Sequence, residues 1–440
     1  MKQEIYELLK SNIKRNSVKF LMPGHKGRLD EIAVLNSHFD FTESFDTDNL
    51  NNPQGAIKRS QIRAANVFGA KSTFYTVNGS SGAIIASVFY STKPGDSILV
   101  SRNCHISVIR AAIIRRLKVF YINTDFKDGF DRNISFENFK KAFDDVKPSA
   151  VVITHPNYYG FPTPIDDIVE YLKDKDAVLI VDEAHGGHFV FNDELPKSAI
   201  KAGADIVIQS VHKMLTGLNQ SAFIHLASNR VDKDKLFESI KLFQTTSPSY
   251  PVIASCEIAA SFMQVEGRKL LAENIKLAKD FVDRLKTLPN VNVLDYCGRD
   301  PLKIVFNVEG VAGESLHEEL YKNYNIECEM NDGQNVLMLA TLMNKKEDYD
   351  LAFDAIVNIS KDKMGTNSFR EFSLNIPQKK YEPYEVYELP SECIKKCDAV
   401  GRVCAEFVAP YPPGVPVVVP GEIISEDVYD YLEEWINVIK

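Results

Sequence analysis

The stretch AVLIVDEAHGGH (177–188) joins an apolar run to a polar cluster, and this pattern decides the expected fold. Six other short apolar runs have the same character: STFYTV (72–77), DSILV (96–100), KVFYIN (118–123), AVVIT (150–154), ADIVIQ (204–209) and SAFIHL (221–226). Continuous rather than alternating hydrophobicity is typical of strands that are buried on both faces. Helical stretches separate several of the runs, which predicts βαβ units and an α/β domain with a mainly parallel sheet.

The rest of the chain predicts further units. KLLAENIKLAKDFVDRLKTL (269–288) has the pattern of a long amphipathic helix that could link two domains. The apolar runs after it alternate with helical segments, as in a smaller α+β unit. The last part has a proline-rich segment, APYPPGVPVVVPGE (409–422), before an expected final helix over 425–440. We therefore expect an N-terminal helical arm (1–22), a large domain (23–285), a small α+β domain (286–365) and a C-terminal domain (366–440).

Composition limits the classes of function. The chain has 440 residues, 45% hydrophobic content and a formal charge of -9, which argues against a general binder of nucleic acid or anionic membranes. No apolar stretch reaches the length of a membrane span, and the seven scattered cysteines fit a reducing cytoplasm. Cys393, Cys397 and Cys404 lack the paired C-x-x-C form of a zinc site, so we expect no structural metal there.

Unusual polar residues follow five of the predicted strands. The clusters are NGSSGA, SRNCH, HPNYYG, DEAHGGH and SVHK. In open α/β sheets, ligands bind beyond the carboxyl ends of the strands. Because five clusters converge on one edge, the sequence predicts a single site there.

The first cluster opens a helix. Gly79 lets the backbone approach a ligand, Ser80 and Ser81 can donate hydroxyl hydrogen bonds, and free amides at a helix start form an anion site. The alternative is an ordinary helix N-cap, for which serine is a favoured residue.

The fourth cluster begins with Asp182, a carboxylate at a buried strand end that needs a partner. That partner is either a nearby Lys or Arg or a cationic ring nitrogen of a ligand. Ala184 is small enough to lie against a flat ring, and His185 could hydrogen-bond a ring substituent. His185 and His188 could also suggest a metal, although no third ligand lies at a recognisable spacing.

Lys213 comes soon after the apolar run 204–209, behind Ser210 and His212, in a position where a lysine is costly to bury. Desolvation lowers the pKa of a lysine and activates it as a nucleophile toward an aldehyde. His105, at the same edge, is by default a satisfied buried histidine but could stack on a bound ring, and Ser210 could add a phosphate contact. An anion site, an acid for a ring nitrogen, a stacking residue and a nucleophilic lysine together describe pyridoxal 5′-phosphate.

The motifs MPGHKG, VNGSSG, SRNCH, HPNYYG, DEAHGGH, QSVHK, TTSPSYP and PYPPGVPVVVPGE resemble those of the bacterial ornithine/lysine/arginine decarboxylases. The resemblance runs from about residue 20 to about residue 425 and implies the aspartate-aminotransferase fold. The chain resembles a short form, because larger relatives carry a further domain before the PGHK-type motif.

The resemblance also implies roles for particular residues. Lys213 would join the cofactor, Asp182 would pair with its ring nitrogen and His105 would stack on its ring. Other residues are expected around the phosphate or the reacting atoms: Ser80, Ser81, Ser210 and His212. Thr245, Thr246 and Ser247 are expected to come from a neighbouring subunit, which implies at least a homodimer with shared active sites. His25 and Glu422 are expected near the substrate, Glu422 at its distal, cationic end. Ile106 stands where the family pattern leads us to expect a polar or basic residue.

The expected function is decarboxylation of a basic amino acid, first of all L-arginine to agmatine, then of lysine or ornithine. An aminotransferase is the main rival function and would need an arginine for the substrate carboxylate, for which Arg299 and Arg402 are candidates. Two further functions stay open at this point: a non-catalytic binding protein of the same fold, and a metal-dependent hydrolase that uses His185 and His188.

Overall fold

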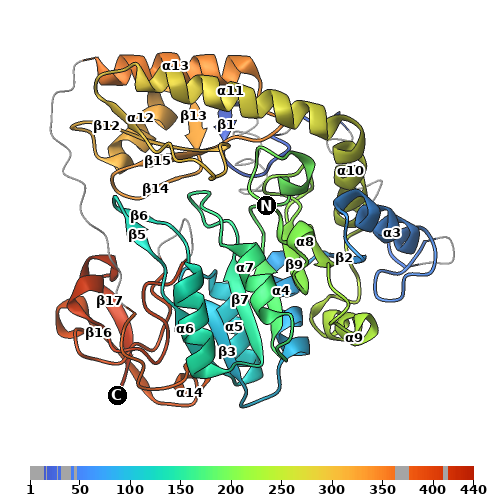
Figure 1. Cartoon of the computed structure of the whole chain (residues 1–440). Coiled ribbons are helices and arrows are strands. Elements are labelled where there is room, and N and C mark those ends of the chain that lie inside the picture. The colour runs from blue at the N-terminus through green and yellow to red at the C-terminus, as the bar shows by residue number, and fades with distance from the viewer. Residues whose placement is uncertain are drawn as a thin grey trace, which may run out of the picture.

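The computed structural model describes residues 14–15, 17–26, 28–30, 41–43, 47–361, 376–409 and 415–440. Most of the expected N-terminal helical arm therefore lies outside the described residues. Figure 1 shows a central sheet with helices on both sides, a smaller layer of strands and helices above it, and a C-terminal unit at one flank.

Each of the seven apolar runs forms one strand of a single sheet, in the order β2-β10-β9-β8-β7-β3-β4. Within this sheet β10 is antiparallel to both neighbours, and the other pairs are parallel. The predicted mainly parallel α/β sheet is thus confirmed. The strands are β2 (Ser72–Thr76), β3 (Ser97–Ser101), β4 (Lys118–Ile122), β7 (Ala150–Thr154), β8 (Val178–Asp182), β9 (Ile206–Ser210) and β10 (Ala222–Leu226).

Alternate residues of each strand enter two separate hydrophobic clusters, which explains the continuous apolar runs. In β8, Leu179 and Val181 belong to one cluster and Ile180 to the other. Three helices cover the Ile180 face: α4 (Gly79–Ser91), α5 (Ile106–Arg115) and α9 (Lys233–Phe243). Helices with residues in the other cluster include α3 (Ala56–Phe68), α6 (Phe136–Val146), α7 (Ile165–Leu172), α8 (Ala199–Ala202) and α10 (Tyr250–Phe262).

The expected long helix is α11 (Arg268–Lys286), which leads into the small domain. This domain has a four-stranded sheet in the order β11-β12-β15-β14, covered in Figure 1 by α11 and α13. Its other elements are β11 (Val291–Val293), β12 (Lys303–Val308), α12 (Gly313–Tyr324), β13 (Ile326–Cys328), β14 (Met330–Asn331), β15 (Val336–Leu339) and α13 (Lys346–Ser360). Residues from the expected N-terminal arm contribute a strand, β1 (Val18–Phe20), which pairs in parallel with β13.

The expected final helix over residues 425–440 is wrong. Glu426–Tyr431 form a 3₁₀ helix, and Trp435–Ile439 form strand β17, which pairs antiparallel with β16 (Ser391–Lys395). In β17, exposed Trp435 and Asn437 alternate with buried Ile436 and Val438. This two-residue period and the β-branched side chains favour a strand once β16 provides a partner.

The C-terminal domain also covers the edge strand β4. Lys379 Nζ donates to the carbonyl oxygen of Val119 at 2.6 Å, and Glu382 Oε2 accepts the Val119 N–H at 3.0 Å. An exposed strand edge invites pairing with other chains. The side chains of Lys379 and Glu382, which lie just before α14 (Pro383–Val386), thus satisfy both backbone hydrogen-bonding groups of one residue at this edge.

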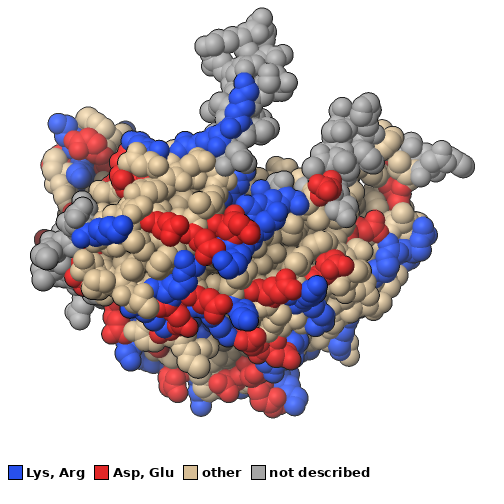
Figure 2. Space-filling model, turned by 90° about the horizontal axis from the view of Figure 1, so that it is seen from above, with Lys and Arg blue, Asp and Glu red and all other residues tan. Residues whose placement is uncertain are grey.

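Among the described residues, no helix has the length and apolar character needed to cross a membrane. Figure 2 shows the face above α11 and α13, where acidic and basic side chains are mixed rather than gathered by sign.

Candidate functional site

A cavity of about 1270 Å³ lies at the predicted edge of the sheet. It is bounded by strand ends of the large domain, by the Met330–Asn335 loop of the small domain and by the C-terminal domain. The structure thus brings together clusters that are far apart in the sequence. The expected site residues that line it are Gly79, Ser80, Ser81, His105, Asp182, Ala184, His185, His212 and Lys213.

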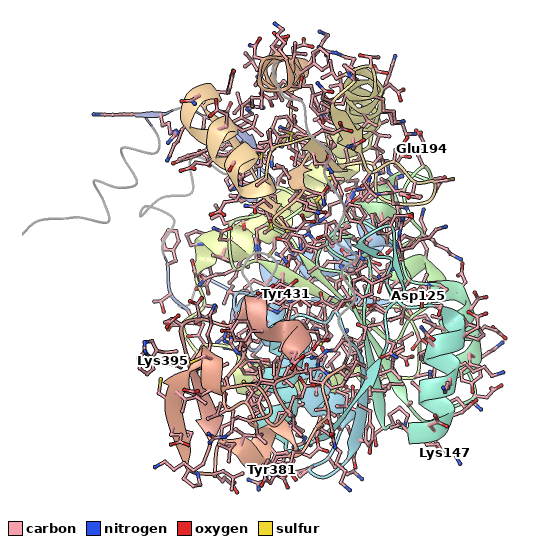
Figure 3. The ribbon with its side chains drawn as sticks, turned by 90° about the vertical axis from the view of Figure 1, so that its left-hand side faces the viewer. Asp125, Lys147, Glu194, Tyr381, Lys395 and Tyr431 are labelled. Carbon is pink, nitrogen blue, oxygen red and sulfur yellow. The ribbon has the colours of Figure 1, made fainter. Side chains whose placement is uncertain are left out.

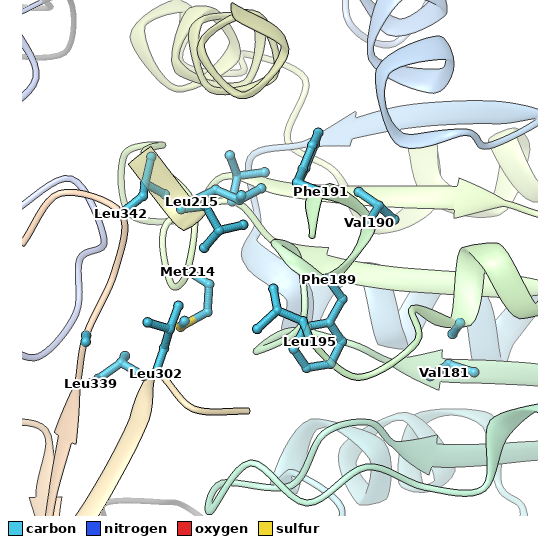
Figure 4. Close-up of a cluster of buried hydrophobic side chains, with 14 of the residues drawn as sticks. Val181, Phe189, Val190, Phe191, Leu195, Met214, Leu215, Leu302, Leu339 and Leu342 are labelled. Atoms are coloured by element: carbon cyan, nitrogen blue, oxygen red, sulfur yellow. The ribbon is translucent and has the colours of Figure 1, made fainter. Parts of the chain in front are cut away.

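Lys213 lies in the loop after β9, and buried apolar neighbours hold this loop in place. Met214 and Leu215 are 1% and 0% exposed. Figure 4 shows them beside Leu302 and Leu339 of the small domain, in a cluster that also includes Phe189 and Leu195 of the large domain. The lysine is therefore fixed by packing between two domains, while its own half-buried side chain faces the cavity.

Gly24, in the MPGHKG motif, packs against the same loop. Its N–H donates to the His212 carbonyl oxygen at 2.8 Å, and its carbonyl oxygen accepts from Thr341 Oγ1 at 2.8 Å. A Cβ atom at this position would lie 2.1 Å from the Leu215 carbonyl oxygen and 2.5 Å from that of Lys213. Only glycine allows this approach, so the MPGHKG motif supports the backbone of the Lys213 loop through a close contact that a larger residue would block.

Burial lowers the pKa of Lys213, whereas the nearby carboxylates of Asp182 and Glu329 act in the opposite direction. Lys213 Nζ lies 3.1 Å from His185 Nε2. Burial also holds the pKa of His185 well below its usual value, with Lys213 and Lys303 contributing. The imidazole is therefore neutral, and the amine is moved toward the neutral, nucleophilic form.

Asp182 ends β8 and is 6% exposed. Its Oδ1 accepts the Ala184 N–H at 3.1 Å. Burial raises the pKa of Asp182, and the charge on Lys213 partly offsets this. The carboxyl group lines the cavity and can bind a cationic group of a ligand there.

The start of α4 offers donors for an anion. Asn78 is the N-cap residue, but its side chain makes no capping hydrogen bond and instead donates to the Phe243 carbonyl oxygen at 2.7 Å. The Gly79 N–H donates to the Gln220 carbonyl oxygen at 2.8 Å. The N–H groups of Ser80 and Ser81 have no intrahelical acceptor in the first turn, so they can bind an anion. Ser80 and Ser81 lie in this first turn, and Ser210 Oγ donates to Ser80 Oγ at 2.9 Å. The serines are thus not the N-cap itself, which was the alternative interpretation.

Two further histidines line the cavity in their neutral form. His105 caps α5, where its Nδ1 accepts the Ser107 N–H at 3.2 Å. Burial lowers the pKa of His105 to about 4, with Lys213 and Arg110 adding to the effect. Burial lowers the pKa of His212 to about 4 as well, and its Nδ1 lies 3.2 Å from the Ser221 carbonyl oxygen. A neutral half-buried imidazole such as that of His105 can present its face to a ring.

The HPNYYG cluster positions aromatic groups. The ring of Tyr158 meets the His185 ring edge-on at 4.7 Å between centroids, and its hydroxyl donates to Glu329 Oε1 at 2.6 Å. The Tyr159 hydroxyl donates to Asp332 Oδ2 at 2.8 Å. Both tyrosines therefore tie the large domain to the small domain at the cavity wall.

Other expected site residues do not line this cavity. Ser210 lies behind Ser80, and the half-buried His25 flanks Gly24. Thr245, Thr246 and Ser247 are exposed at the surface of this chain.

The structure places Glu422 differently from our expectation. It is fully buried, and its two carboxylate oxygens accept from Arg102 Nη1 at 2.9 Å and Nη2 at 3.0 Å. Oε2 also accepts the Val419 N–H at 2.9 Å. Within this chain Glu422 does not line the cavity, whereas Arg102 does.

The two arginines considered for an aminotransferase also have other partners. The guanidinium of Arg299 donates to the carbonyl oxygens of Leu294, Tyr159 and Lys303. Arg402 Nη2 donates to Glu392 Oε1 at 2.7 Å. Neither lines the cavity, so the structure gives no support to an aminotransferase.

The structure does not support a metal-dependent hydrolase either, because His185 and His188 do not belong to a cluster of metal-ligating side chains among the described residues. His188 Nε2 lies 3.1 Å from Asp300 Oδ2, and both side chains are fully buried. The described parts of the chain contain no group of three or more His, Cys, Asp or Glu side chains that could hold a metal ion.

Several features of the site are not among those predicted from the local sequence patterns. Arg102 follows β3 directly, so the strand-end rule that selected His105 could have found it. Lys303 is 0% exposed in β12, and its Nζ lies 2.8 Å from His185 Nδ1. The C-terminal domain adds a wall with Ile376, Val415–Val417 and Tyr431. Figure 3 shows Tyr431 on the inner side of this domain and Lys395 at its outer edge.

Comparisons with known proteins agree with this geometry. The model of the Orn/Lys/Arg decarboxylase major domain matches residues 4–351, and that of the C-terminal domain of the same family matches residues 367–440. An arginine decarboxylase of Bacillus subtilis is 34% identical, covering 97% of this chain and 92% of the relative. One from Bacillus anthracis is 32% identical, covering 98% and 92%.

Solved structures show the same fold. Lysine decarboxylase A from Pseudomonas aeruginosa superimposes with a TM-score of 0.80 at 18% identity, covering 98% of this chain and 81% of the other. The lysine decarboxylase LdcF of Francisella novicida gives a TM-score of 0.76 at 20% identity, covering 89% and 73%. The expected fold is thus confirmed, and this chain belongs to the Orn/Lys/Arg decarboxylase family, a family of pyridoxal phosphate-dependent decarboxylases.

Proposed function

We propose that this protein binds pyridoxal 5′-phosphate through Lys213 and decarboxylates L-arginine to agmatine and CO₂. The observation that carries the proposal is that Lys213, Asp182 and the uncapped start of α4 open into one cavity. Four curated relatives named arginine decarboxylase, at 32–34% identity, support arginine over lysine and ornithine.

The side chains present fit this cofactor group by group. The amides and hydroxyls at Ser80 and Ser81 suit a phosphate, and Asp182 suits a protonated ring nitrogen. Ala184 and the neutral His105 suit the two faces of an aromatic ring. The amine of Lys213 suits the aldehyde, because burial favours its neutral form.

When bound, the cofactor supplies an electron sink for the electrons of the bond between Cα and the carboxylate. Asp182 would hold a proton at the ring nitrogen, which keeps that sink strong. Each unit by which a carboxylate raises the pKa of such a nitrogen corresponds to about 1.4 kcal/mol. Lys213 and His212 are the candidates to return a proton to Cα, because both line the cavity.

The cavity wall suits a substrate with a carboxylate and a distal cation. Asp131 and Asp332 line the cavity and provide acceptors for a guanidinium. The apolar side chains of Ile376, Val415 and Val417 would exclude water, which favours loss of the carboxylate as neutral CO₂.

The proposal includes a homodimer with shared active sites. Thr245–Ser247 are exposed, and the Thr245 carbonyl oxygen accepts from Asn51 Nδ2 at 3.0 Å. This leaves the Thr245–Ser247 segment accessible to the site of a second copy. Sedimentation of the purified protein, together with recovered activity on mixing Lys213→Ala and Ser247→Ala variants, would test the sharing.

The decisive experiment incubates the cofactor-loaded protein separately with arginine, lysine and ornithine. We expect agmatine and CO₂ from arginine at a higher kcat/KM than cadaverine from lysine or putrescine from ornithine. The matched control is Lys213→Ala, which should lose the absorbance of the cofactor bonded to Lys213 and nearly all turnover. Preferred turnover of lysine or ornithine would contradict the substrate assignment, and keto-acid formation would contradict the reaction type.

A further inference from the structure

A buried chain of three nitrogen-bearing side chains joins the small domain to Lys213. Lys303 Nζ lies 2.8 Å from His185 Nδ1, and His185 Nε2 lies 3.1 Å from Lys213 Nζ. Lys303 is 0% exposed and His185 is 7% exposed. The imidazole therefore lies between two amines, one on the cavity wall and one behind it.

The chemistry of a neutral imidazole restricts this arrangement. It has one N–H donor and one nitrogen that accepts, whereas an ammonium group has only donors. If both lysines were charged, His185 would need to accept on both nitrogens, and a neutral imidazole cannot do this. One of the two amines must therefore be neutral, with its lone pair accepting the imidazole N–H.

We propose that Lys213 and Lys303 share one proton through His185, so that Lys303 takes up the proton that Lys213 must lose to act as a nucleophile. In one state, charged Lys213 donates to Nε2 and Nδ1–H donates to neutral Lys303. The transfer moves one proton from Lys213 to Nε2 and another from Nδ1 to Lys303. No proton is gained or lost, and Lys213 becomes a neutral amine. Lys303 does not touch the cavity, so it is a positioning residue that acts through His185.

The surroundings of Lys303 allow it to hold either state. Burial is the main cause that lowers the pKa of Lys303 to about 7, and the charges of Lys213 and Arg299 act in the same direction. Asp300 and Glu329 act in the opposite direction, since their negative charge stabilises the charged amine. The Tyr158 ring, whose centroid lies 5.1 Å from Lys303 Nζ, is a further group that favours a cation.

The inference rests on the proposed role of Lys213 and can be tested without turnover. The full chain, freed of cofactor, is mixed with pyridoxal 5′-phosphate, and covalent capture is followed by absorbance at a series of pH values. Borohydride reduction and peptide mass spectrometry then identify the modified lysine. The titration of pyridoxal 5′-phosphate affects the capture rates of the wild type and of every variant equally. We therefore compare the variant with the wild type as a ratio of capture rates at each pH, in which this effect cancels.

We expect this ratio to change with pH for Lys303→Met. Without the second amine, the neutral fraction of Lys213 falls about tenfold for each pH unit below its pKa. Over two units the variant should slow by about 100-fold relative to wild type, whose shared proton keeps the neutral form populated. Lys303→Arg retains a permanent cation that donates to Nδ1, so it should keep the wild-type profile.

Lys303→Gln serves as a second variant in case Lys303→Met does not fold, because its neutral amide can accept from or donate to Nδ1 but carries no charge and takes up no proton. It should behave as Lys303→Met. A pH-independent ratio of variant to wild-type rates for both variants would overturn the shared proton. If the wild type captures no aldehyde at Lys213, the proposed function fails instead.

Discussion

Asp182 and Glu422 are both buried carboxyl groups near the cavity, but their partners differ. Glu422 accepts two hydrogen bonds from Arg102 and one from the Val419 N–H. Asp182 accepts the Ala184 N–H and faces the cavity. Burial raises the pKa of both acids, and nearby cations oppose this in both cases.

This difference separates a carboxylate that holds the fold from one that is available to a ligand. Burial of an acid by itself does not distinguish the two roles, because both residues are less than a tenth exposed. The two roles are distinguished by how many hydrogen-bond partners the carboxylate has within the chain, and by whether one of them is a cation. Arg102 links Glu422 of the C-terminal domain to the end of β3, so this pair docks the C-terminal domain on the large domain.

The largest expected effect is on catalysis at Asp182. Asp182→Ala should lower kcat by at least about 100-fold, the scale of removing one preorganised electrostatic partner. Cofactor binding should weaken but remain measurable by absorbance, because Lys213 and the start of α4 are unchanged. If Asp182→Ala kept the wild-type kcat, Asp182 would not act on the ligand, and its proposed difference from Glu422 would be wrong.

The second effect is on stability at Glu422. Glu422→Gln leaves Arg102 buried without its charge partner, and such a change costs about 3–5 kcal/mol. Denaturant unfolding with tryptophan fluorescence would measure it, since Trp435, the single tryptophan, lies in the C-terminal domain.

Replacing both partners, as in Arg102→Met with Glu422→Met, sharpens the second test. The double variant should be more stable than Glu422→Gln, because no unpaired charge remains buried. Equal or lower stability of the double variant would show that the pair does more than dock the domain.

The smallest expected effect is the stability of Asp182→Asn as a function of pH. Because burial raises the pKa of Asp182, the folded state binds more protons than the unfolded state, and stability falls as the pH rises through this window. Asn does not titrate there, so the variant should be more stable at neutral pH by about 0.5–2 kcal/mol and gain nothing in acid. Thermal unfolding at several pH values would measure this, and a loss of stability at neutral pH would contradict it.

Much of the large domain could be predicted because its signals are local. Each apolar run forms one strand, and each polar cluster follows a strand end. The C-terminal strand β17 was missed because residues 425–434 are acidic and helix-like, while the alternation of 435–439 is short and depends on pairing with β16.

The contributions of the small domain could not be derived in the same way. Lys303 interrupts the apolar run PLKIVFNV (301–308), much as Lys213 follows another, and this signal could have selected it. Its partner His185 is 118 positions away in the chain, and no local pattern joins the two.

The sequence by itself determined the sheet, the edge at which its polar residues gather and the family of the chain. These features depend on apolar runs and on the polar residues that follow them, which are close together in the sequence. Only the tertiary structure decided which buried charges are paired. It joined Glu422 to Arg102 across 320 positions and left Asp182 facing the cavity. The physical reason is that pairing a buried charge depends on distances of a few ångströms between side chains, and the packing of separate domains sets these distances.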